Sequence, residues 1–189
     1  MTSLMDKKNK ALKMMLGFGI GSLFMTFAGL TSAFIVSKNR EDWISNFQLP
    51  DAFYYSLVVI IMSSICLFIA RRLLIKDKIK NVSILILVTI VLGIIFTILQ
   101  FFGFNEIVEN GYHFTGPTSS INSSFVFLIA FVHVLHVIVA LIALIVVFIK
   151  NLNGSYNSTD FTGFELASIF WHFVDFLWIY LFIFLVFFG

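Results

Sequence analysis

Charged residues and cysteine are scarce in this sequence. Only 12% of the 189 residues are charged, and Cys66 is the single cysteine. A typical soluble domain carries about 25% charged residues, so the composition excludes an ordinary soluble fold. One cysteine excludes an internal disulfide framework and a metal site built on paired thiolates. Proline is limited to Pro50 and Pro117, and both lie in polar gaps between apolar runs.

Apolar residues are abundant and gather in long runs. They make up 60% of the sequence, with 25 phenylalanines, and the mean hydropathy is +1.02. A helix needs about 20 mostly apolar residues to cross the hydrocarbon core of a bilayer. The gaps between the runs are too short for an independent domain. We therefore predict an all-α integral membrane bundle that forms one domain over residues 1–189, with five transmembrane helices at about residues 14–36, 52–75, 82–104, 123–149 and 164–188.

The basic residues are distributed unequally between the two sides of this predicted bundle. The N-terminal tail has four, the gap after the second span has five and the gap after the fourth span has one, which makes ten on one side. The opposite side has only Lys38 and Arg40. Cytoplasmic loops carry the excess of lysine and arginine, so we expect a cytoplasmic N-terminus and an external C-terminus.

The lysines before the first apolar run also permit a second interpretation, a cleavable secretory signal peptide. Small residues that suit cleavage, Thr31, Ser32 and Ala33, follow the run. However, the run has about 23 residues, which is longer than the apolar part of a typical signal peptide. We therefore expect this run to be the first transmembrane helix.

The ionisable residues inside the spans are concentrated in the last two helices. Such groups are costly in hydrocarbon, so each needs a partner or a function. Neighbours three or four residues apart share one face of a helix, and the two helices run in opposite directions at overlapping depths. A hydrogen-bonded network of histidines and carboxylates between the two helices is therefore geometrically possible. The candidate residues for an intramembrane polar network or a lipid contact are His133, His136, Glu165, Trp171, His172 and Asp175.

Three interpretations of these residues are open. The polar groups could fasten the fourth and fifth helices together, because hydrogen bonds contribute to helix association in lipid. Alternatively, Glu165 and His172 could face a cavity and bind a lipid headgroup or handle protons. The third interpretation is a metal or haem site at His133 and His136, although two histidines three residues apart are a weakly specific pattern.

Small residues cluster in the first span. Gly17 and Gly21 lie four residues apart, and Ser22 follows directly. Small residues at this spacing let a second helix approach closely, so they mark a possible helix-contact face. The alternative is that glycine is merely tolerated in a membrane helix.

Two motifs resemble the subunit III family of haem-copper cytochrome oxidases. Residues 163–178 read GFELASIFWHFVDFLW and are similar to the closing helix of that family, which typically contains F-E and then W-H-F-V-D-x-x-W. Residues 131–137 read FVHVLHV and resemble its H-x-L-H-V helix. Weaker similarities to the family occur at Ser63 and Ser64, at residues 92–100 and at residues 27–30. Five spans resemble the short bacterial form of a family whose longer members have seven helices.

The resemblance implies a function within the aerobic electron transport chain. It implies a non-catalytic subunit that stabilises the oxygen-reducing, proton-pumping subunit, binds phospholipid and aids proton uptake. It further implies a hetero-oligomeric complex with subunits I and II in the bacterial cytoplasmic membrane, and no nucleic-acid partner. We expect haem and copper in those partner subunits and no cofactor in this chain. Four histidines and one cysteine are too few for two haems and a copper centre.

One position departs from the family pattern. Where the family commonly has a membrane-embedded glutamate after a serine, this sequence has Leu23 after Ser22. A proton-buffering function of that glutamate is therefore in doubt here.

Other functions also fit parts of the pattern. An accessory subunit of a quinol oxidase or of a nitric oxide reductase would have a similar sequence. A small proton-coupled transporter is the alternative of a different class, although the sequence has no inverted repeat. The external loop at residues 106–117, with Tyr112 and His113, could contact a donor protein or be solvated, and we favour solvation.

Overall fold

The computed structural model describes residues 2–40, 43, 49–112, 114, 120–154, 156 and 161–188. These residues form five α-helices, and each helix is long and apolar enough to cross a membrane. The prediction of an all-α membrane bundle with five spans is therefore confirmed. The helices are α1 (Thr2–Ser37), α2 (Asp51–Leu74), α3 (Ile79–Glu109), α4 (Ile121–Leu152) and α5 (Thr162–Phe188).

Most helices are longer than the apolar runs that predicted them. Helix α1 begins at Thr2 and includes the lysine-rich segment, and α3 continues to Glu109. Helix α2 ends at Leu74, one residue before its predicted end. The helices continue past the apolar runs because helical hydrogen bonding does not depend on hydrocarbon, and polar side chains at the ends can reach water.

Local sequence signals set several helix ends. Asp51 lies in the first turn of α2, and Arg71 and Arg72 lie in its last turn, where they complement the helix dipole. Ser120 caps α4 because its hydroxyl accepts a hydrogen bond from the Ser123 backbone N–H at 3.2 Å. The Ser123 hydroxyl in turn accepts from the Ser120 backbone N–H, which completes a capping box.

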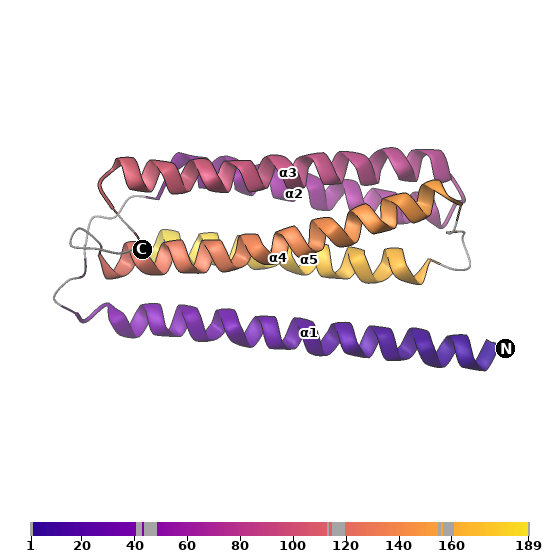
Figure 1. The fold of residues 1–189 in the computed structure, drawn as a ribbon, viewed down its shortest axis with the longest axis horizontal. Helices are drawn as coiled ribbons and strands as arrows, with labels where there is room; N and C mark the ends of the chain where they lie inside the picture. Colours follow the sequence, from indigo (N-terminus) through magenta and orange to yellow (C-terminus); the bar gives the residue numbers. More distant parts are fainter. Residues whose placement is uncertain are drawn as a thin grey trace.

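The helices lie in three layers (Figure 1). The α2–α3 hairpin covers one side of the α4–α5 pair, through contacts of α2 with α5 and of α3 with α4. Helix α1 packs on the opposite side, against α4 and α5. Helix α5 is therefore in contact with α1, α2 and α4, and it is the most deeply buried span.

The core of the bundle is aromatic. Trp171 and Trp178 of α5 are fully buried. The Trp178 ring contacts the rings of Phe53 in α2 and Phe96 in α3 edge-on, with centroid distances of 5.5 Å in both cases. Edge-to-face contacts of this kind favour one arrangement of the rings. The central tryptophans therefore favour one orientation of α5 relative to the α2–α3 hairpin.

Two glycines of α3 make room for these large rings. A Cβ atom on Gly93 would lie 2.5 Å from the Trp171 ring and 2.7 Å from Leu141. Similarly, a Cβ atom on Gly103 would collide with the Phe53 ring. Because small residues let neighbouring helices approach closely in lipid, both glycines are structural requirements of the packing.

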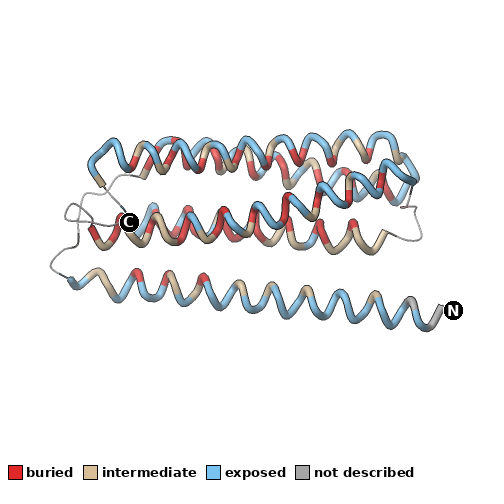
Figure 2. The backbone as a smooth tube through the Cα atoms, viewed as in Figure 1, coloured by how far each residue is buried: buried red, intermediate tan, exposed pale blue. Residues whose placement is uncertain are grey.

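Helix α1 is the least buried of the five spans (Figure 2). Its buried positions are Phe27, Thr31 and Phe34, all in its second half. Its first half exposes large apolar side chains such as Met15 (70%) and Phe18 (78%). Exposed apolar side chains are expected where a helix contacts lipid or another membrane subunit.

Candidate functional site

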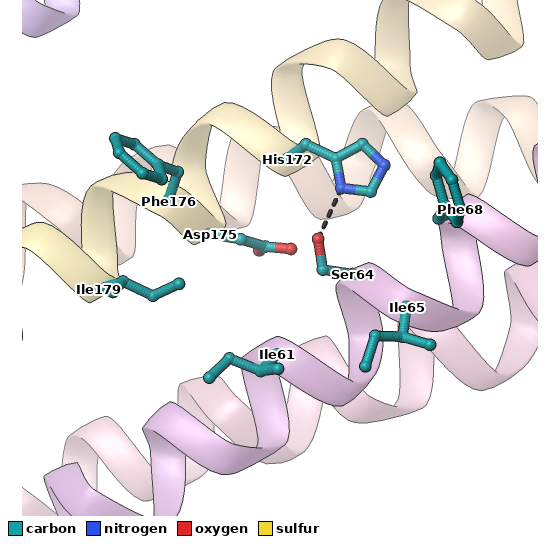
Figure 3. A pocket seen from close by; sticks show the side chains of 8 residues that line it. All are labelled: Ile61, Ser64, Ile65, Phe68, His172, Asp175, Phe176 and Ile179. Atoms are coloured by element: carbon teal, nitrogen blue, oxygen red, sulfur yellow. Dashed lines mark hydrogen bonds between the residues drawn. The ribbon is translucent and has the colours of Figure 1, made fainter.

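A groove on the bundle surface between α2 and α5 contains three polar side chains (Figure 3). His172 and Asp175 come from α5, and Ser64 comes from α2. His172 Nδ1 and Ser64 Oγ form a hydrogen bond of 2.6 Å. The groove has a volume of about 460 Å³, and apolar side chains form the rest of its lining: Ile61, Ile65, Phe68, Phe176 and Ile179. We call it the α2–α5 groove.

Two further polar contacts of α2 lie in the core, one with α5 and one with α3. Trp171 Nε1 donates a hydrogen bond of 3.1 Å to Ser63 Oγ. One heptad earlier in α2, Ser56 Oγ accepts a hydrogen bond of 2.9 Å from Gln100 Nε2 of α3. The Ser56 and Gln100 contact was not predicted as part of the site. The seven-residue spacing of Ser56 and Ser63 is the signal that places both on one face of α2.

His133 of α4 lies in a box of aromatic rings. Its side chain is fully buried and stacks on Trp178 with a centroid distance of 5.0 Å. The rings of Phe96 and Phe27 meet it edge-on at 5.9 and 6.3 Å. Neither ring nitrogen of His133 has a hydrogen-bond partner among the described residues. His133 therefore acts as an aromatic packing residue in this arrangement.

His136 forms a local contact instead. Its Nδ1 lies 2.7 Å from the Val132 carbonyl oxygen, one turn earlier in the same helix. Its ring also meets Phe27 of α1 edge-on at 6.1 Å. His136 therefore faces α1, and this hydrogen bond does not reach across to α5.

The structure does not bring the predicted histidine–carboxylate network together. His172 pairs with Ser64 of α2, whereas His133 of α4 stacks on Trp178. Trp178 is six positions after His172, which places the two side chains about 120° apart around α5. The contacts of His172 and of His133 therefore lie on different sides of α5.

Glu165 forms ion pairs at one end of the bundle. Its carboxylate lies 2.7 Å from Lys13 Nζ of α1 and 3.4 Å from Arg71 of α2. Glu165 does not line the α2–α5 groove. Lys13 and Arg71 were not among the predicted site residues. Their positions at the ends of the first and second spans, on the same side of the membrane as the start of the fifth, are the signal that could have found them.

The predicted helix-contact face of α1 is exposed. Gly17, Gly21 and Ser22 are exposed, and no atom of the described chain lies within 4 Å of a Cβ built on either glycine. Leu23 packs against the core. In the loop after α3, Tyr112 also packs against the core, and His113 lies outside the described residues.

The family described as Cytochrome c oxidase subunit III matches residues 44–189, which include α2 to α5 and both motifs of the sequence analysis. The chain belongs to this family. A cytochrome c oxidase subunit 3 of Spodoptera frugiperda is 32% identical over 137 residues, covering 72% of this chain and 87% of that protein. The counterpart in Bacillus sp. (strain PS3) is 28% identical over 183 residues, covering 94% and 85%. That of Loxodonta africana is 34% identical over 125 residues, covering 66% and 46%.

These relatives define the chain as an accessory subunit III of a haem-copper oxidase. It is a component of a multi-subunit oxidase complex and a multi-pass membrane protein. The matched region contains the α2–α5 groove, His133 and Glu165. Phe27 of the aromatic box and Lys13 of the ion pair belong to α1, which lies outside the matched region. Within the described part of subunit III, no three histidine, cysteine or acidic side chains converge as metal ligands would.

Replacing His133 by leucine should leave subunit III nearly as stable as the natural chain. Leucine has a similar volume, and volume-conserving apolar swaps usually cost less than about 1.5 kcal/mol. Trp171→Ala is the contrasting variant and should cost about 3–5 kcal/mol, because it empties a fully buried site. Thermal unfolding in detergent measures both. A loss in His133→Leu as large as that in Trp171→Ala would show that His133 binds something in the core.

Proposed function

We propose that this subunit III supports the oxygen-reducing subunit structurally and carries neither haem nor copper itself. The separate surroundings of its three membrane histidines support this. His133 packs among aromatic rings, His136 bonds to its own helix backbone and His172 bonds to Ser64. Haem and copper would then reside in the partner subunits I and II, and the chain would act without nucleic acid or a chemical step of its own.

The outer face of α1 is the proposed contact with a partner subunit. Gly17, Gly21 and Ser22 are exposed there, and α1 itself lies on the side of the α4–α5 pair opposite the α2–α3 hairpin (Figure 1). Small side chains let a helix of another subunit approach the backbone closely. Large apolar neighbours, such as Phe18, would fill the sides of such a contact.

The proposed location is the bacterial cytoplasmic membrane, with the N-terminus inside. Ten of the twelve basic residues lie on the side that would face the cytoplasm, and bacterial relatives cover most of the chain. On that side, a hollow of about 520 Å³ is lined by Asp6, Lys10 and Lys13 of α1 and Thr162 of α5. Lys13 is paired with Glu165, so Lys10 is the lysine that no ion pair of the described residues engages. Lysines at the membrane surface attract anionic headgroups, so this hollow is the proposed phospholipid contact.

A complex prepared without this subunit should retain haem and most of its initial oxygen-reducing rate. It should lose activity faster during repeated turnover, because binding of a partner subunit stabilises the folded catalytic subunit. Oxygen consumption over many turnovers, followed beside the complete complex, measures both quantities. An immediate and complete loss of rate with haem still bound would indicate a direct chemical function and would contradict the proposal.

A further inference from the structure

Helix α1 is attached to the rest of the bundle mainly by its C-terminal part. The Phe34 ring contacts the rings of Phe125 in α4 and Phe184 in α5, with centroid distances of 5.7 and 5.4 Å. One turn earlier, the Thr31 hydroxyl lies 3.2 Å from the Tyr180 hydroxyl of α5. Edge-to-face ring contacts and a hydrogen bond both depend on direction, so they fix this part of α1 against α4 and α5.

Lys38 adds a further contact at the same end. Its ammonium group lies over the ring of Trp43, 5.8 Å from the centroid, and over the ring of Phe188, 5.2 Å away. A cation within about 6 Å of an aromatic face is attracted to it. The segment that follows α1 is therefore joined to the last turn of α5.

The N-terminal part of α1, residues 6–26, has no comparable packing (Figure 2). None of these residues is buried, over a length of about 30 Å along the helix. Leu16, Ile20 and Leu23 are half-buried on the side that faces the bundle. In lipid, apolar side chains gain little from contacting a helix rather than acyl chains, so these three residues hold this part of α1 only weakly.

Glu165 supplies the directional contact that this part of α1 otherwise lacks. Its carboxylate lies 2.7 Å from Lys13 Nζ and is also within 3.4 Å of Arg71 in α2. Among the described residues, no other ion pair joins α1 to another helix. Next to the pair, the hollow of about 520 Å³ lies between α1 and the start of α5. Charge, and not close packing, therefore holds α1 near α5 at this end.

We infer that Glu165 is a positioning residue for α1. Its ion pair with Lys13 holds the N-terminal part near α5, and without the pair this part moves away from α5 about its aromatic attachment. The consequence rests on the proposed function. Gly17 and Gly21 belong to the part that moves, so the ion pair sets where α1 presents its small residues to a partner subunit.

Distances between spin labels on the full-length subunit III in nanodiscs test this inference. The N-terminal label pair joins Ala11 of α1 to Ile149 of α4, and the C-terminal label pair joins Val36 of α1 to Phe102 of α3. All four positions are exposed, and Cys66→Ser removes the natural thiol. Pulsed electron paramagnetic resonance gives the distribution of distances for each pair.

Glu165→Gln and Lys13→Gln should each lengthen the distances of the N-terminal label pair. The Lys13 side chain is 48% exposed and that of Glu165 is 21% exposed. Exposed ion pairs are weak, so we expect the population of long distances to rise about two- to fivefold. The C-terminal label pair should not change, because the aromatic attachment remains. Lys10→Gln is the matched control: it makes the same change on the same helix at a lysine without an ion pair among the described residues, and it should alter neither distance.

Salt provides a second measurement without any charge substitution. Raising NaCl from about 0.05 to 0.5 M screens an exposed pair and should also lengthen the distances of the N-terminal label pair. Unchanged distances in both charge variants would overturn the inference, and so would an equal shift in Lys10→Gln. The proposed partner contact is tested by a different quantity, the haem that co-purifies with Gly21→Leu, so the two claims can fail independently.

Discussion

Replacing Gly93 by valine should destabilise the bundle strongly. The first atom of any side chain at this position would lie 2.5 Å from the Trp171 ring and 2.7 Å from Leu141. Trp171 cannot yield easily, because it is rigid, fully buried and hydrogen-bonded to Ser63. Overpacking of a filled core costs about 1–3 kcal/mol and occasionally more, and we expect the upper part of this range. The measurements are the thermal unfolding midpoint in detergent and the amount of subunit III in membranes.

Gly29→Val is the matched control for this prediction. Gly29 also lies within a membrane helix, but nothing in the described chain lies within 4 Å of a Cβ built there. The control therefore carries the same change in side chain without the collision. If both variants unfolded at the same temperature, the close approach of α3 to Trp171 would not matter for stability, and the packing account would be wrong.

Gly21→Leu should abolish most of the co-purification of subunit III with the haem-containing subunit. A leucine at this exposed position of α1 would hold a neighbouring helix away from the backbone that Gly17 and Gly21 leave accessible. The chain itself should stay folded, because position 21 contacts nothing within the bundle. Haem absorbance per tagged subunit III after purification in mild detergent measures the effect, and thermal unfolding of the variant alone checks its fold.

Val91→Leu provides the corresponding control on the opposite side of the bundle. Val91 is 48% exposed on α3, so the substitution enlarges another outward-facing side chain. It should leave the haem content unchanged. Equal haem loss in both variants would mean that assembly is sensitive to any enlargement of the surface. Normal haem content in Gly21→Leu would move the partner contact away from α1.

The spans could be predicted from the sequence because hydrocarbon imposes a length and a composition on every crossing helix. The neighbouring helix toward which each polar side chain points could not be predicted. His172 bonds to Ser64 of α2 and not to a histidine of α4, because the packing of the tryptophans sets the rotation of α5. That rotation depends on Gly93, whose function is visible only once Trp171 lies against it.

The ion pairs of Glu165 follow from the charge distribution of the sequence. Its partners Lys13 and Arg71 had already been assigned to the same side of the membrane from the charge distribution. Opposite charges at the same end of neighbouring helices are natural candidates for pairing. The same reasoning could not identify the aromatic box around His133, because ring contacts among many phenylalanines have no distinct spacing in the sequence.

Purification of the tagged chain in mild detergent, followed by a visible spectrum, is the most direct test of the central claim. The account predicts haem absorption together with a much larger, histidine-rich membrane subunit. After dissociation of the complex, the haem should stay with that large subunit, and this chain should be colourless. Haem that remained bound to the separated chain would contradict the proposal that it carries no cofactor. A colourless preparation without any partner would contradict the account of the chain as a supporting subunit of the oxidase.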